Sequence, residues 1–213
     1  MPLPPKLDAE RVARAERALA RADARLGAVI RIAGPCPLRA RGRPYAQLVR
    51  SVLYQQLAGA AARTIELRFL ALFGGRTPAP GVLAATRSDR LRRAGLSRAK
   101  VRAVKAIAQA FDSGAVRERR LWHLDDADVV AALVPIHGVG EWTAHMLLMT
   151  ALGRPDVLPS GDYGVRKGAQ LLFGLPALPT ARELEVLAAP WQPHRSVAAW
   201  YLWRHDAIAD AVS

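Results

Sequence analysis

Cysteine is almost absent from this sequence of 213 residues, because Cys36 is the only one. A single thiol cannot form an internal disulfide, and it cannot supply the four thiolates that an iron–sulfur cluster or a cysteine-rich zinc site requires. The sequence also lacks a run of about 20 apolar residues, the length that spans a bilayer, and it does not begin with a basic segment followed by an apolar one. We therefore expect a protein of the reducing cytoplasm with no membrane partner and no iron–sulfur cluster.

Acidic residues are scarce relative to basic ones. The 18 Asp and Glu residues oppose 31 Lys and Arg residues, which leaves a formal net charge of +13 and a pI near 11.2. A surface of this sign attracts polyanions such as nucleic acids. An arginine-rich proteome could produce part of the excess without such a partner, so the charge needs a motif beside it. The hydrophobic content of 51% allows one large core, or two lobes.

The alternating pattern of a β-strand is also missing, and apolar residues recur at helical spacing along nearly the whole chain. A first helix after Asp8 would carry Val12, Leu19 and Leu26 on one face. The sequence predicts about ten helices and an all-α fold. The helix starts that we expect, from capping residues and first-turn prolines, are Asp8, Pro44, Ser97, Asp125, Thr180 with Glu183, and Pro193.

One stretch, residues 133–144, combines a hydrophobic helix end, a glycine turn and a new amphipathic helix. Gly138 and Gly140 let the backbone adopt conformations that are closed to other residues and approach a ligand closely, and the next helix offers unpaired N–H groups to a phosphate. The alternative is a turn that merely joins two packed helices. Carbonyls in the same hairpin could hold a monovalent cation, Na⁺ or K⁺, against the phosphate. These are the carbonyls of Val134, Ile136 and Val139.

Asp162 lies downstream of this hairpin, in the segment 158–168, where another helix is expected to begin. A carboxylate at a helix start can be a simple N-cap, and Asp162 taken alone favours that interpretation. A hairpin that can hold phosphate, followed at this spacing by a carboxylate, is the more specific pattern.

Four segments together resemble the helix-hairpin-helix (HhH-GPD) DNA glycosylase superfamily, and within it the DNA-3-methyladenine glycosylase II type. These segments are Gln55–Leu57, Gly138–Ala144, Gly161–Asp162 and Trp191–Trp203. The resemblance extends over nearly the whole chain, 1–213. It implies a compact two-lobed helical fold with a cleft between the lobes. One lobe would be a six-helix barrel over about residues 44–155, and the other would combine about 1–43 with 156–213.

The resemblance also implies a monofunctional DNA glycosylase. Such an enzyme flips out alkylated bases, 3-methyladenine and 7-methylguanine above all, and hydrolyses them from DNA to leave an abasic site in base excision repair. We expect it to act as a monomer on damaged double-stranded DNA near the nucleoid, with no required cofactor. The missing β-domain ahead of the first helix, together with Met146 where an aromatic is common, leaves the range of lesions open.

The roles of individual residues follow from the same resemblance. Asp162 would be the catalytic carboxylate, stabilising an oxocarbenium-like sugar and orienting the attacking water. Relatives that also cut the strand carry a hairpin lysine where this chain has Trp142, so no lyase activity is expected. Gln56 is the expected wedge, the side chain that fills the gap left in the base stack by the flipped base, with Leu57 or Gln55 as alternatives. The expected base pocket comprises Trp142, Trp203, Tyr54, Tyr163 and Met146. The expected contacts to the DNA backbone are His137, Gly138, Val139, Gly140, Thr143, Arg166 and Lys167.

Three other functions compete with this interpretation. A non-catalytic DNA-binding module would use the hairpin only to hold the backbone. A bifunctional glycosylase/lyase for oxidised bases would cut the strand, although the hairpin lysine and the cysteine cluster are missing. A basic helical regulator would leave the joint occurrence of the four motifs unexplained.

Overall fold

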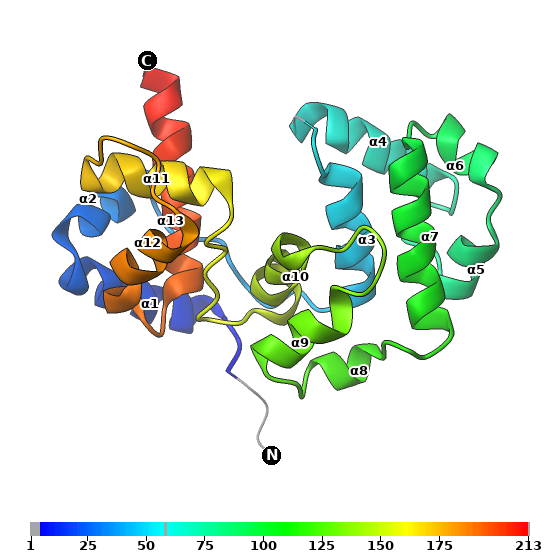
Figure 1. Cartoon of the computed structure of the whole chain (residues 1–213), viewed down its shortest axis with the longest axis horizontal. Coiled ribbons are helices and arrows are strands. Elements are labelled where there is room, and N and C mark those ends of the chain that lie inside the picture. Colours follow the sequence, from blue (N-terminus) through cyan, green and yellow to red (C-terminus); the bar gives the residue numbers. More distant parts are fainter. Residues whose placement is uncertain (1–4, 58, 213) are drawn as a thin grey trace. The chain divides into compact units, whose positions relative to one another are not determined.

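The computed structural model describes residues 5–57 and 59–212, and all regular secondary structure within these ranges is helical (Figure 1). This confirms the all-α prediction. The chain forms two compact units, with residues 42–147 in unit 1 and residues 5–41 and 148–212 in unit 2. Residues 1–4, expected in the second lobe, lie outside the described ranges. Among the described helices, none has the length and apolar character needed to cross a membrane.

Unit 1 is a continuous segment of helices that begins at Pro44, which occupies the first turn of α3 as predicted. Its core is built by apolar side chains of α3 and α7 with exposed fractions of 0–1%, among them Leu48, Val52 and Ile107. The helices of unit 1 are α3 (Pro44–Tyr54), α4 (Gly59–Ala71), α5 (Pro80–Ala85), α6 (Ser88–Arg93), α7 (Arg98–Asp112), α8 (Glu118–Leu121), α9 (Asp126–Leu133) and α10 (Glu141–Leu147).

Unit 2 is assembled from two segments that are distant in the sequence. Its centre is the packing of α11 on α13, where the backbones approach so closely that a Cβ on Gly168 would lie 2.1 Å from the carbonyl oxygen of Leu202 (Figure 1). The helices are α1 (Ala9–Ala22), α2 (Ala24–Ala33), the π-helix η1 (Leu148–Leu152), α11 (Tyr163–Phe173), α12 (Ala181–Leu187), the 3₁₀ turn η2 (Ala189–Trp191) and α13 (Arg195–Val212).

Several predicted helix starts are confirmed by their caps. Asp8 Oδ1 accepts the Arg11 N–H at 2.8 Å, and Ser97 and Asp125 accept N–H groups of α7 and α9 in the same way. Thr180 and Glu183 form the reciprocal capping box expected at α12. Local cap chemistry therefore set these helix starts.

Three boundaries differ from the prediction. The first helix is interrupted at Asp23, because this side chain accepts the N–H groups of Arg25 and Leu26 and starts a second helix. The final helix begins at Arg195 rather than Pro193, because the Arg195 N–H donates to the Asp156 carboxylate, 39 residues away. Residues 148–155, expected in the barrel lobe, belong to unit 2. There Arg41 donates its N–H to the carbonyl of Thr150, and Leu7 to that of Gly153.

Candidate active site

The hairpin between α9 and α10 depends on one glycine. Gly138 has φ +84°, and a Cβ at this position would lie 2.3 Å from Cβ of Ala103 on α7. A side chain is therefore excluded both by the backbone conformation and by the packing of the turn on α7. Gly140 does not share this conformation, so that part of the prediction is wrong. It is exposed, and a Cβ there would meet nothing within 4 Å, which leaves its backbone open to a ligand.

The predicted wedge segment follows α3 and is tied to the hairpin. Gln55 donates from Nε2 to the carbonyl oxygen of Gly138 and to Oγ1 of Thr143, both at 3.2 Å. Lys100 donates from Nζ to the carbonyl oxygen of Leu53 at 2.6 Å, at the carboxyl end of α3. The structure therefore makes Gln55 a residue that positions the loop. It also buries the Thr143 side chain, which has an exposed fraction of 1%.

Gln56 and Leu57 form the exposed tip of this segment. Gln56 has φ +55°, a left-handed conformation that is uncommon for a residue with a side chain. Strained backbone of this kind is found at functional sites when the surroundings hold it in place. The two residues remain the predicted wedge.

The predicted pocket residues of unit 1 have different surroundings. Trp142, the second residue of α10, is 39% exposed, and Met146 is half-buried. Tyr54 is engaged elsewhere, because its hydroxyl donates to Glu66 Oε2 at 2.7 Å and the Arg50 guanidinium lies 4.3 Å from the centre of its ring. Trp142 is thus the aromatic of unit 1 that is most accessible to a base. His137, a predicted backbone contact, is exposed in the same hairpin.

Glu66 is a buried acid that the sequence analysis missed. Burial alone would raise the pKa of its carboxyl group, but the hydrogen bond from Tyr54 and the nearby Arg50 outweigh burial and lower the pKa. Arg63 also donates to this carboxylate, at 3.3 Å. The cluster links α3 to α4 on either side of the wedge segment. The only sign of this cluster in the sequence is a glutamate within a segment whose apolar residues recur at helical spacing.

Asp162 in unit 2 is both the N-cap of α11 and the partner of a tryptophan. Its Oδ1 accepts the Val165 N–H at 2.8 Å and the Nε1–H of Trp203, from α13, also at 2.8 Å. The N-cap interpretation is therefore correct, but it does not account for the indole. Two donors from two helices fix the orientation of a half-buried carboxylate.

Gly164 makes this arrangement sterically possible. A Cβ at this position would lie 2.9 Å from Cδ1 of Trp203 and 3.3 Å from Oδ1 of Asp162. Gly164 lies two residues after Asp162, and because it has no side chain the indole can reach the carboxylate. The sequence predicts Trp203 and Asp162 as separate pocket and catalytic residues, and the structure joins them through a hydrogen bond.

The remaining predicted residues of unit 2 lie close to Asp162 in the sequence. Tyr163 is 67% exposed. Arg166 donates from Nε to the carbonyl oxygen of Pro179 at 2.6 Å, and Lys167 donates from Nζ to Gln170 at 3.0 Å. Both cations thus have contacts within unit 2, and Arg166 holds the loop before α12.

Comparison with known proteins identifies the class to which this fold and these residues belong. The family model described as HhH-GPD superfamily base excision DNA repair protein matches residues 49–193. The chain therefore belongs to the HhH-GPD superfamily.

Individual members of this superfamily resemble the chain in both sequence and structure. The chain is 35% identical over 169 residues to DNA-3-methyladenine glycosylase 1 of Schizosaccharomyces pombe, covering 78% of this chain and 74% of the relative. A solved structure of the 3-methyladenine DNA glycosylase Mag1 of the same yeast, in complex with abasic DNA, superposes with a TM-score of 0.84 at 32% identity, covering 92% of this chain and 98% of that one. A DNA-3-methyladenine glycosidase of Bacillus halodurans gives a TM-score of 0.79 at 32% identity, covering 92% and 91%.

Proposed function

We propose that this protein is a monofunctional DNA glycosylase that hydrolyses alkylated bases, including 3-methyladenine and 7-methylguanine, from DNA and leaves an abasic site. The carboxylate of Asp162, held between the start of α11 and the indole of Trp203, is the observation that carries the proposal. The superfamily membership and the activities in the names of its relatives point to the same reaction.

The chemistry requires a carboxylate of fixed orientation. The bond between the sugar C1′ and the base nitrogen breaks, the electron pair leaves with the base, and the sugar becomes an oxocarbenium-like cation. Asp162 stabilises this cation and orients a water molecule, whose oxygen bonds to C1′ and whose proton passes to the carboxylate or to solvent. An alkylated purine is electron-poor and carries positive charge, so it stacks favourably on an exposed indole such as that of Trp142.

Trp142 also underlies the proposed absence of strand cleavage. A lyase forms a Schiff base through an amine at the hairpin, and an indole cannot form one. The product is therefore an intact strand with an abasic site, which breaks only after alkali.

The hairpin would hold the DNA backbone. The exposed Gly140 and the +84° turn at Gly138 allow a phosphate to approach the backbone closely. The carbonyls of Val134, Ile136 and Val139 would bind Na⁺ or K⁺ there. Ile136 O already accepts the Val139 N–H at 2.9 Å, so a cation would use the second lone pair of that oxygen. No other cofactor is required, and the enzyme would act as a monomer on damaged duplex DNA near the nucleoid.

Base release from DNA treated with a methylating agent tests the proposal. Asp162→Asn keeps an N-cap and removes the charge, so it should slow release about 100-fold or more with little loss of stability. Asp8→Asn is the matched control, because Asp8 caps α1 through the same Oδ1 contact at 2.8 Å, and it should release bases at the wild-type rate.

Two results would contradict the proposal. DNA binding without base release by the wild-type protein, across several alkylated lesions, would make the chain a non-catalytic backbone clamp. Strand breaks before alkali treatment would make it a bifunctional glycosylase/lyase.

A further inference from the structure

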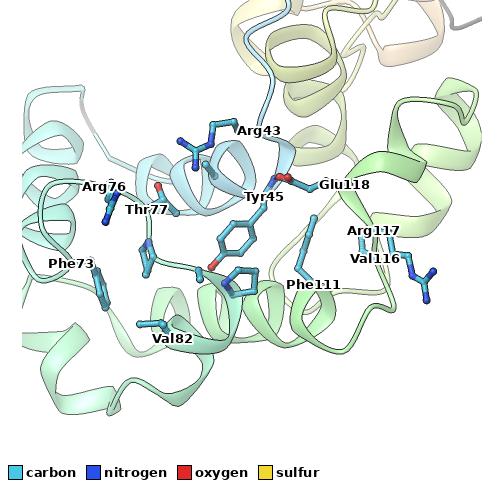
Figure 2. A pocket seen from close by; sticks show the side chains of 14 residues that line it. Arg43, Tyr45, Phe73, Arg76, Thr77, Val82, Phe111, Val116, Arg117 and Glu118 are labelled. Carbon is cyan, nitrogen blue, oxygen red and sulfur yellow. The ribbon is translucent and has the colours of Figure 1, made fainter.

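A cavity in unit 1 is lined by none of the residues to which we assign base release. Its volume is about 690 Å³, within the range of about 300–1,000 Å³ that is usual for small-molecule sites. The start of α3, the turn after α4, α5, the end of α7 and the start of α8 surround it (Figure 2).

Tyr45 presents an unusual group to this cavity. The side chain is 7% exposed, and its buried hydroxyl has no hydrogen-bond partner within residues 5–57 and 59–212. The ring is held in place, because the Tyr45 N–H donates to Glu118 Oε1 at 2.8 Å and the ring centre lies 5.3 Å from that of Phe111. Figure 2 shows the ring in the middle of the lining side chains. A buried polar group without a partner is costly, and a ligand atom could satisfy it.

The hydroxyl can donate its proton to an acceptor atom of a ligand. Burial, together with the negative charges of Asp112 and Glu118, raises the pKa of Tyr45 well above its usual value, so the proton stays on the phenol. An oxygen or an unprotonated nitrogen of a ligand would accept this hydrogen bond.

The remaining lining residues define the rest of the ligand. The lining includes three arginines, Arg43, Arg76 and Arg117, but only one carboxylate, that of Glu118. This carboxylate already accepts the Tyr45 N–H, so the cavity has a surplus of cationic donors. Guanidinium groups donate pairs of hydrogen bonds to the oxygens of phosphates and carboxylates, whereas the rings of Phe73 and Phe111 and the nearby prolines suit a flat ring.

We propose that this cavity binds a nucleotide. The base lies against the apolar wall and accepts a hydrogen bond from the Tyr45 hydroxyl, and the phosphate is bound by Arg43 and Arg76. The nucleotide can be free, or it can be an unpaired residue of a DNA strand, since both present the same ring and phosphate.

Titration of a protein with ¹³C-labelled tyrosine rings tests this site directly. The chain has four tyrosines, and the Tyr45 signal is the one that disappears in Tyr45→Phe. Deoxyguanosine monophosphate should shift this signal, and deoxyguanosine and inorganic phosphate should each bind at least about tenfold more weakly. A single-stranded oligonucleotide that shifts it at a lower concentration than the free nucleotide would identify the strand as the source of the ligand. The reverse order would identify the free nucleotide.

Variants separate the site from the fold. Tyr45→Phe keeps the ring and loses no internal hydrogen bond of the hydroxyl, so it should unfold no more easily than the wild type. Its Kd for the nucleotide, measured by calorimetry because this variant lacks the Tyr45 signal, should rise about five- to tenfold. Arg76→Gln should raise the Kd about tenfold or more. The control Arg87→Gln makes the same change of charge at an exposed arginine that pairs with Asp89, and it should leave the Kd unchanged.

The proposal fails if none of the probes shifts the Tyr45 signal at millimolar concentration, as expected if water alone satisfies the hydroxyl. It also fails if Tyr45→Phe and Arg76→Gln bind the nucleotide as tightly as the wild type. All of these variants should still release methylated bases, so this result is independent of the one obtained with Asp162→Asn.

Discussion

Replacing Gly164 with alanine tests whether the indole of Trp203 holds the proposed catalytic carboxylate, that of Asp162, in place. The added Cβ would lie 2.9 Å from Cδ1 of Trp203, closer than such atoms approach in proteins, so the ring has to move by a few tenths of an ångström. That movement lengthens or misaligns the 2.8 Å hydrogen bond from Nε1 to Asp162 Oδ1.

The expected magnitude follows from that one contact. A hydrogen bond to a charged group contributes about 1.5–3 kcal/mol, and about 1.4 kcal/mol corresponds to a tenfold change in rate. Single-turnover base release should therefore slow about 10- to 100-fold. Global stability should change little, because alanine gains up to about 1 kcal/mol in a helix and the local overlap costs about 1–3 kcal/mol.

Single-turnover release from methylated DNA and urea unfolding of the same samples provide the assay. Gly168→Ala is the contrasting variant on the same helix, since its Cβ would lie 2.1 Å from a backbone oxygen, and it should lose stability rather than activity alone. In a Trp203→Phe background, which already lacks the N–H, Gly164→Ala should slow release little further. An unchanged rate in folded Gly164→Ala, or the same further loss in both backgrounds, would refute the positioning role of the indole.

Two further predictions concern unit 1. Gly138→Ala should lower the free energy of unfolding, measured by urea titration, by about 2–4 kcal/mol, because alanine at a φ of +84° is strained and its Cβ overlaps Ala103. An equal loss in Gly140→Ala would contradict this reason. Glu66→Gln should flatten the acid side of the stability profile. The pKa of this buried acid lies below its ordinary 4.5 in the folded chain, through Tyr54 and neighbouring arginines, so its contribution is present above that value and is lost as the pH falls through the folded pKa. A wild-type slope between about pH 5 and pH 3 in the variant would show that the cluster does not contribute.

Much of the fold could be predicted from local chemistry. The caps at Asp8, Ser97, Asp125 and Thr180 act within one turn, so the sequence around each of them contains the whole interaction. Asp23 caps a helix in the same way, but the helical spacing of apolar residues continues past it. This spacing predicted one helix where the structure has two.

Boundaries set by distant residues could not be predicted. The start of α13 depends on Asp156, which accepts the Arg195 N–H and pairs with its guanidinium at 2.7 Å. The same limit applies to the candidate site. The motifs indicated Asp162 and Trp203 individually, whereas their hydrogen bond requires α11 and α13 to pack side by side. No local pattern predicts that the Gln55 side chain binds the hairpin.

The discontinuity of unit 2 has a consequence for biosynthesis. The described residues of unit 1, 42–147, form one continuous segment, so a ribosome translates all of its helices before α11 and α13, the later partners of α2. Asp162 emerges in that interval, but Trp203 follows 41 residues later. A nascent or prematurely terminated chain can thus contain the whole hairpin and the Asp162 carboxylate and still lack the indole that donates to it. Competence for base removal would therefore be acquired only after Trp203 has been translated.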